Sequence, residues 1–149
     1  MKAVLLIALV LAAATAGLGR AESSAQGGAT VTTAMSKLGP ILVDSRGRTL
    51  YLFERDPRGR SACAGPCAVY WPPLLTNAGP NANRKAKQSL LGVIRRSDGT
   101  RQVTYAGHPL YRYAGDGRPG SIAGQDSRAF GASWYVVSPG GQKVESDGS

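Results

Sequence analysis

The chain contains the stretch Gly-Arg-Thr-Leu-Tyr-Leu-Phe-Glu-Arg-Asp at residues 47–56 and the related stretch Gly-His-Pro-Leu-Tyr-Arg-Tyr-Ala-Gly-Asp at residues 107–116. The glycine, leucine, tyrosine and aspartate positions are identical at a fixed offset, and the second aromatic position is Phe53 in one copy and Tyr113 in the other. Self-similarity at a fixed offset is typical of duplicated supersecondary units that cover each other's apolar faces. The repeat therefore predicts two equivalent halves packed together.

Each copy fits the pattern Tyr-x-aromatic-x-x-Asp, with the members Tyr51, Phe53, Asp56, Tyr111, Tyr113 and Asp116. On a strand the tyrosine and the second aromatic share one face, because side chains alternate with period two. The aspartate follows where a proline or glycine ends the strand, so its carboxylate can accept bonds from backbone N–H groups of the turn. We interpret these residues as core aromatics with a turn-capping acid. Paired Asp and Tyr sites for a cation or a sugar are the alternative.

Turn residues separate short apolar or β-branched runs along the rest of the chain, which favours strands over helices. Residues 41–43 and 49–53 predict a hairpin, residues 91–95, 102–105 and 110–113 a meander, and residues 134–137 a last strand. The predicted fold class is all-β, with two repeated antiparallel units of three to four short strands packed as a sandwich or an irregular barrel. Trp71 and Trp134 follow the two copies at similar distances, and the repeats span about 38–75 and 90–141. A basic loop at 76–88 joins them, with a short helix over 83–91 as the alternative.

The first 21 residues predict a secretory signal peptide. Lys2 precedes an uncharged run from Val4 to Gly19 that is too short for a transmembrane helix, and small residues favour cleavage after Ala21. We expect a flexible arm at 22–30, a single domain at 31–141 and a polar tail at 142–149. The mature protein should be secreted or periplasmic, and soluble after processing.

The chain is basic, with 18 Lys and Arg against 9 Asp and Glu and a net charge of +9. Cleavage after Ala21 removes Lys2 and Arg20 and leaves +7. This excess favours an anionic envelope surface or polymer as partner. The basic residues form no stripe or recognised motif, so specific nucleic-acid binding is not expected. The oligomeric state stays open.

The two Tyr-x-aromatic-x-x-Asp motifs, together with Cys63-Ala-Gly-Pro-Cys67 and the Trp-Tyr-Val-Val-Ser run from Trp134, resemble the bacterial "secreted repeat of unknown function" family of predicted lipoproteins. The resemblance extends from about Gly39 to Gly141 and implies an envelope context and a duplicated unit. The chain departs from the family in lacking a cysteine for lipid attachment, and it has His108 where relatives more often carry tryptophan. The family has no established activity, so the resemblance implies no reaction.

Cys63 and Cys67 are the only cysteines, and in an oxidising compartment they predict a disulfide. The alternative is a redox or copper-handling protein, in which Cys63, Cys67 and the only histidine, His108, would form a soft ligand set. No metal or other cofactor is expected under the first interpretation. No hydrolase, phosphate-loop, zinc or calcium motif is present, and an enzyme is not expected. The sequence thus predicts a non-catalytic binding or structural module of the envelope.

Overall fold

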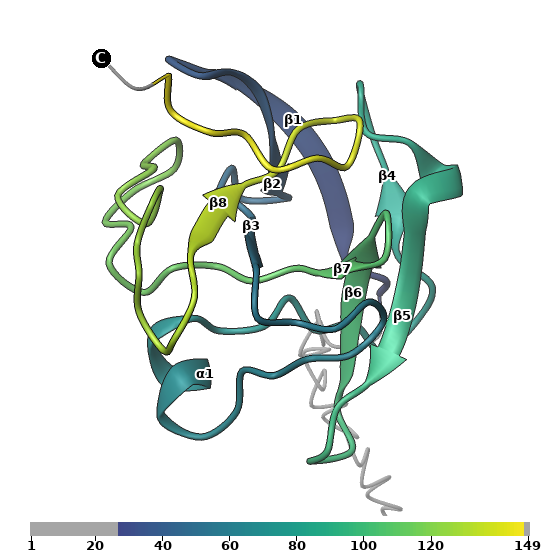
Figure 1. The fold of residues 1–149 in the computed structure, drawn as a ribbon. Helices are drawn as coiled ribbons and strands as arrows, with labels where there is room; N and C mark the ends of the chain where they lie inside the picture. Colours follow the sequence, from purple (N-terminus) through teal and green to yellow (C-terminus); the bar gives the residue numbers. More distant parts are fainter. Residues whose placement is uncertain (1–26, 148–149) are drawn as a thin grey trace, which may run out of the picture.

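The computed structural model describes residues 27–147, and the predicted signal peptide lies outside these residues. Three small β-sheets with almost no helix make up this part of the chain (Figure 1). The elements are β1 Thr30–Ser36, β2 Gly39–Asp44, β3 Tyr51–Phe53, α1 Pro66–Tyr70, β4 Asn81–Ala82, β5 Leu91–Arg95, β6 Arg101–Tyr105, β7 His108–Pro109 and β8 Trp134–Val136. None of these sheets closes into a barrel. The all-β prediction is confirmed.

The first sheet has the order β2-β1-β4. β1 and β2 form an antiparallel hairpin from Val31 opposite Asp44 to Ser36 opposite Gly39. The sequence prediction placed the start of the ordered chain here but named no strand before residue 41. β4 adds to the other edge of β1 in parallel orientation over two residues, which differs from the purely antiparallel expectation.

The β5-β6-β7 sheet contains the predicted meander. Ala106 and Gly107 connect β6 to β7 with positive φ angles of 50° and 82°, as a tight two-residue hairpin turn requires. The third strand differs from the prediction of 110–113, because β7 ends at Pro109. The chain then leaves β6, and Tyr111 pairs with a residue of the other repeat.

The two repeats exchange strands at the centre of the molecule. Tyr51 and Tyr111 face each other as an antiparallel pair, with N–H to O distances of 2.8 and 3.0 Å. β3 of the first repeat pairs with β8 of the second, and Tyr111 of the second pairs with Pro73 of the first. In Figure 1, β3 and β8 lie on the left, and the β5-β6-β7 sheet lies on the right. Each half therefore completes its hydrogen bonding only with strands from the other half.

The predicted hairpin of 41–43 with 49–53 is correct only at its turn. Gly47 donates its N–H to Asp44 O at 3.0 Å, and Val43 pairs with Thr49. Beyond Leu50 the chain turns away from β2, because the partner of β3 is β8. Local turn chemistry specified the reversal, whereas the strand pairing depended on the second repeat.

A stack of four aromatic rings forms the centre of one of two apolar clusters. Centroid distances are 4.0 Å from Phe53 to Trp134, 3.9 Å from Trp134 to Trp71, and 4.4 Å from Trp71 to Tyr113. The stack alternates between repeats, since Phe53 and Trp71 belong to the first and Trp134 and Tyr113 to the second. Tyr51 and Tyr111 meet the tryptophan of their own repeat edge-on, at 5.4 and 5.2 Å.

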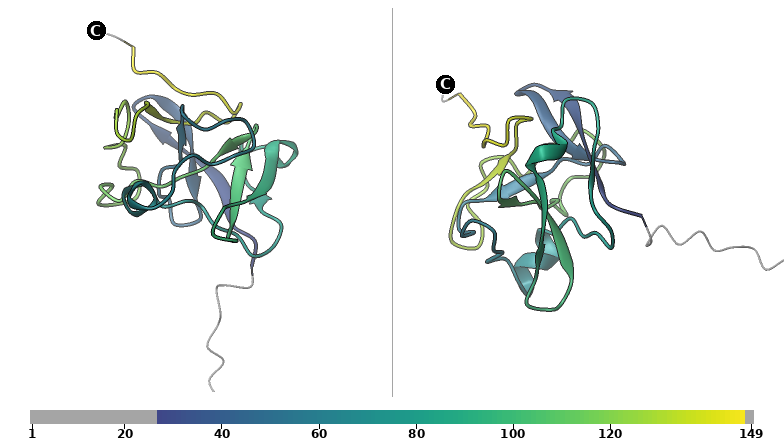
Figure 2. Two further views of the ribbon diagram at one scale, coloured as in Figure 1. Left: turned by 60° about the horizontal axis from the view of Figure 1, so that its bottom comes forward. Right: turned by 90° about the vertical axis from the view of Figure 1, so that its right-hand side faces the viewer.

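The connecting segments show three further features. The loop at 76–88 contains β4, and the alternative helix over 83–91 is reduced to one 3₁₀ turn at Gln88–Leu90. The short helix α1, which no sequence pattern predicted, lies at one end of the molecule (Figure 2). Structure continues beyond residue 141, because Val144 donates its N–H to Val136 O at 2.9 Å.

Candidate functional site

The tyrosines and aspartates of the repeat bond across the two halves. Tyr51 donates its hydroxyl to Asp116 Oδ2, and Tyr111 donates its hydroxyl to Asp56 Oδ2, both at 2.7 Å. The remaining carboxylate oxygens accept backbone N–H groups, from Ala62 at 2.6 Å for Asp56 and from a residue of the following loop at 2.9 Å for Asp116. The motif therefore joins the two repeats as well as closing its own loops. Sequence reasoning had assigned it only the second of these tasks.

Two serines extend the repeat beyond the predicted motif. When the alignment of the two copies is extended past the aspartates, Ser61 aligns with Ser121, and both copies contain the pattern Asp-x-Arg-x-x-Ser. Ser61 Oγ lies 2.7 Å from the Tyr111 hydroxyl oxygen, and Ser121 donates to Asp116 Oδ1 at 3.0 Å. Sequence reasoning missed these residues, although the same offset would have found them.

Arg96 is a third residue that sequence reasoning missed. Its side chain is buried and donates to Ser61 Oγ at 2.9 Å, to Gln102 Oε1 at 2.8 Å and to Cys63 O at 2.6 Å. Ser61 in turn contacts Tyr111, which bonds Asp56. A continuous hydrogen-bonded chain thus links a buried cation to a partly buried carboxylate. Nothing in the sequence distinguishes Arg96 from the exposed Arg95 beside it.

Burial is the largest influence on the pKa values of the tyrosines and aspartates in these pairs. It raises the pKa of Asp56 to about 6, although the bonds from Ala62 and Tyr111 and the charge of Arg96 act in the opposite direction. Burial also raises the pKa of Asp116. The pKa values of Tyr51 and Tyr111 lie above the usual range because of burial first and of the neighbouring aspartates second. Both phenols therefore stay protonated and serve as donors.

We expect Asp56 to make the protein less stable as the pH rises from about 4 to about 6. Its folded-state pKa of about 6 exceeds the unfolded value, so the folded state binds more protons in this window and the free energy of unfolding falls as they are released. Allowing for partial solvent exposure, the loss should be about 1–2 kcal/mol.

Urea unfolding of the wild type and of Asp56→Asn from pH 4 to 7 tests this prediction. Burial lowers the pKa of His108, which makes stability rise with pH in part of the same window, so only the difference between the two proteins isolates Asp56. The advantage of the wild type over the variant should shrink towards pH 6. A constant difference would contradict the prediction.

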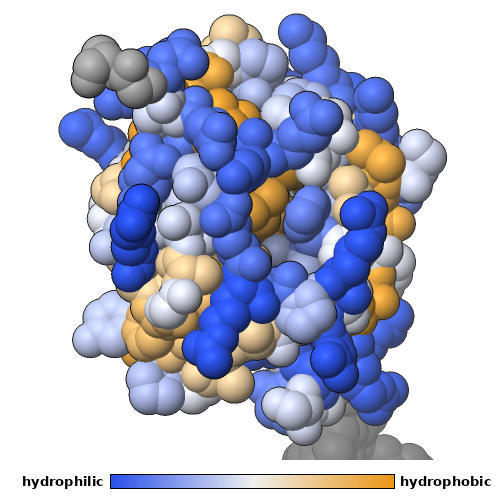
Figure 3. Space-filling view, in the orientation of Figure 1, coloured by the Kyte–Doolittle hydropathy of each residue, from blue (hydrophilic) through white to orange (hydrophobic). Residues whose placement is uncertain are grey.

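A pocket with a volume of about 790 Å³ lies beside β3. Figure 3 shows this face hollowed near its middle, with hydrophilic residues around a hydrophobic patch. Both repeats contribute to the pocket, which is lined by Leu52, Phe53, Glu54, Asp56, Arg58, Ala106, His108, Gly140, Gly141, Gln142 and Lys143. The pocket is thus a product of the strand exchange and not of either repeat alone.

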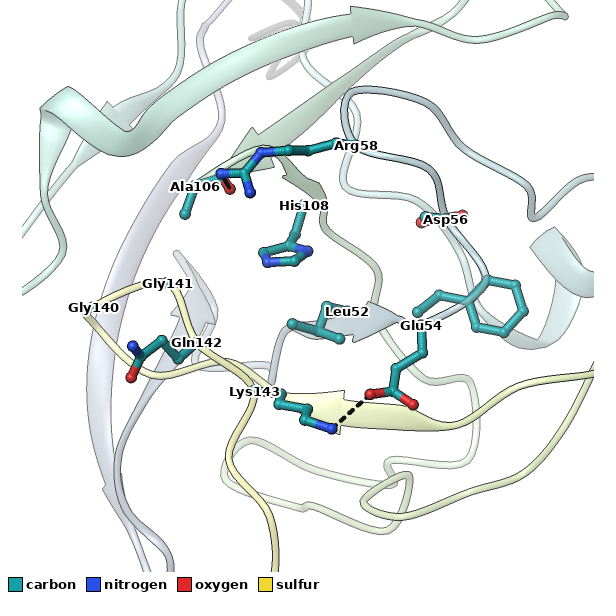
Figure 4. Close-up of a pocket in the computed structure, with 11 residues that line it drawn as sticks. Leu52, Glu54, Asp56, Arg58, Ala106, His108, Gly140, Gly141, Gln142 and Lys143 are labelled. Atoms are coloured by element: carbon teal, nitrogen blue, oxygen red, sulfur yellow. Dashed lines mark hydrogen bonds and ion pairs between the residues drawn. The ribbon is translucent and has the colours of Figure 1, made fainter.

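His108 projects into the middle of this pocket, between Arg58 and Leu52 (Figure 4). The imidazole is half-buried, and burial together with the nearby Arg58 charge lowers its pKa. The other charged groups are engaged, because Lys143 Nζ lies 2.7 Å from Glu54 Oε1 and Arg58 donates to Ala106 O at 3.0 Å. The imidazole has no hydrogen-bond partner within residues 27–147. It is therefore a neutral donor and acceptor available to a ligand.

The Cys63 and Cys67 sulfurs are bonded at 2.01 Å, which confirms the predicted disulfide. The bridge encloses the start of α1, and its short loop contributes about 2 kcal/mol to stability by restricting the unfolded chain. Cys67 lines a pocket with Phe130, whereas His108 lines the pocket beside β3. Within the part of the chain that the structure describes, no three His, Cys, Asp or Glu side chains are placed to hold a metal ion. The ligand set of the copper alternative is thus not assembled.

A duplicated all-β fold whose halves exchange strands, stabilised by one disulfide, defines the chain as a small two-repeat protein. It belongs to the family described as "secreted repeat of unknown function", whose model matches residues 32–75 and 92–138. The predicted family is therefore confirmed. Searches of curated proteins and of solved structures found no match. Residues 27–147 contain no helix with the length and apolar character needed to cross a bilayer.

Proposed function

We propose that the protein is a secreted or cell-envelope binding module without catalytic activity, and that the pocket beside β3 holds its ligand. The observation that carries the proposal is the free, half-buried imidazole of His108 above the apolar side chain of Leu52. Family membership and the disulfide support the location. None of the residues lining this pocket is Ser, Thr, Cys or Tyr, so His108 has no hydroxyl or thiol of the lining to activate.

The chemistry of the pocket favours a neutral, hydroxyl-rich ligand. Glu54 and Lys143 compensate each other, and Asp56 is occupied by Tyr111 and Ala62. A sugar ring can place its apolar face on Leu52 and bond His108 and Arg58 through its hydroxyls without breaking either of these pairs. Pockets that combine an apolar surface with few convergent polar groups are typical small-molecule sites. We therefore propose a glycan unit of the envelope as the ligand class.

Titration of ¹⁵N-labelled mature protein with N-acetylglucosamine trimer tests this function. We expect saturable shifts at His108, Leu52 and Gly141, and a roughly 3- to 10-fold weaker affinity for His108→Ala, the usual effect of one lost hydrogen bond. Lys85→Ala, an exposed change in the 76–88 loop, should leave the affinity unchanged. Saturable binding elsewhere on the surface, or equal affinities of both variants, would contradict the proposal.

A further inference from the structure

Residues of both repeats form a smaller pocket at the position equivalent to the pocket beside β3. Its volume is about 150 Å³, and its lining includes Arg48, Arg112, Tyr113 and Asp116. In the repeat alignment these residues correspond to His108, Leu52, Phe53 and Asp56 of the larger pocket. Duplication therefore placed two arginines where the other site has a neutral imidazole and a leucine.

Arg112 is a cation without a partner. Its Nε is buried and has no hydrogen-bond partner, and the guanidinium takes part in no ion pair within residues 27–147. Burial first, then the charge of Arg48, lower its pKa; the charge of Asp44 acts in the opposite direction, and that of Arg46 lowers it again. An arginine still keeps its charge under these conditions.

The carboxylates nearby are already committed to other donors. Asp44 Oδ2 accepts Arg48 Nε at 2.8 Å, and its Oδ1 accepts the backbone N–H groups of residues 46 and 48, both at 2.9 Å. Asp116 accepts from Tyr51, Ser121 and Ala123. Neither aspartate forms an ion pair with Arg112. Among the described residues, the Arg112 guanidinium is therefore the charged group of this pocket that no carboxylate pairs with.

We propose that this arginine pocket binds a compact oxyanion, a phosphoryl group, between Arg48 and Arg112. A guanidinium presents paired N–H donors that match phosphate oxygens. The volume of about 150 Å³ accommodates one such group. The net charge of the chain adds a long-range attraction towards anionic polymers and lipids. The inference concerns a second site and does not depend on the ligand of the pocket beside β3.

Titration of the mature protein with inorganic phosphate at constant ionic strength tests this site. We expect saturable shifts at Arg48, Arg112 and Tyr113. Arg112→Leu installs the side chain found at the equivalent position of the other repeat, and it should weaken binding at least 10-fold, the effect of losing a charge-assisted hydrogen bond. Lys85→Leu, which removes an exposed charge outside the pocket, should change binding less than 2-fold. Arg112→Lys keeps the charge without the planar guanidinium group and should give an intermediate affinity. This variant tests the site even if Arg112→Leu does not fold.

Vesicles containing phosphatidylglycerol distinguish the source of the phosphoryl group. A lipid headgroup is the source if the protein sediments with these vesicles, and if this sedimentation is reversed by inorganic phosphate and lost in Arg112→Leu. A soluble phosphate or phosphoester is the source if the protein binds phosphate but does not sediment with the vesicles. Either result supports the site. The proposed site is overturned if binding does not saturate at about 50 mM phosphate. It is also overturned if Arg112→Leu and Lys85→Leu weaken phosphate binding equally, because scattered surface charge would then explain the attraction.

Discussion

Trp134→Ala is expected to destabilise the protein by about 3–5 kcal/mol, as large-to-small changes of a buried aromatic do. Trp134 is fully buried, with Phe53 on one face of its ring at 4.0 Å and Trp71 on the other at 3.9 Å. Its Nε1 also donates to Ala129 O at 2.8 Å. A small domain has a total stability of about 5–15 kcal/mol, so the variant should be largely unfolded under mild heating or low urea.

Urea unfolding followed by circular dichroism measures this loss. Trp134→Phe keeps a ring in the stack and should lose less than half as much stability. Phe130→Ala, at a ring that is 38% exposed, serves as the matched aromatic control and should have a small effect. If Trp134→Ala and Phe130→Ala lowered the stability equally, the stack would not be the centre of the fold.

Arg96→Leu should lower the free energy of unfolding by about 2–4 kcal/mol. The change leaves Gln102 Oε1 without its donor, leaves Cys63 O with only the 3.3 Å bond from Ser61, and takes the compensating cation away from Asp56. Arg95→Leu, the same change at the exposed neighbour, should stay within about 0.5 kcal/mol of the wild type. Loss of the cation should also raise the pKa of Asp56 further and steepen the fall in stability towards pH 6.

Measuring both variants at pH 4 and pH 7 separates packing from charge. A penalty for Arg96→Leu that is larger at pH 7, where Asp56 is ionised, identifies the charge as the cause. If Arg95→Leu and Arg96→Leu behaved alike, the buried network would not contribute to stability.

The exchange of strands explains why the domain needs both repeats. β3 finds its partner in β8, and the hydroxyls of Tyr51 and Tyr111 find theirs in the aspartates of the opposite repeat. The two equivalent pockets that result have diverged at the positions of Arg48 and His108. Duplication thus supplied a symmetrical core, and substitution around it gave the two pockets different chemistry.

The sequence by itself determined the repeat, the all-β class and the disulfide. Alternating aromatics, turn residues and paired cysteines are local signals, and their physical meaning depends only on neighbours along the chain. The same signals predicted the turn at Asp44–Gly47 and the hairpin of β5 and β6. The short helix α1 had no such signal, because five residues that include Pro66 and Cys67 form no periodic pattern.

Only the tertiary structure decided which strands pair and which charges are buried. A three-residue strand such as β3 has too few positions to specify its partner, and the partner proved to lie in the other repeat. Arg95 and Arg96 are indistinguishable in sequence, yet one is exposed and the other is buried against Cys63 and Gln102. The contrast between Arg48 and His108 likewise acquires its meaning only when the exchange brings each into a pocket lined by both repeats. Such contacts join residues far apart in the chain, and local patterns carry no information about them.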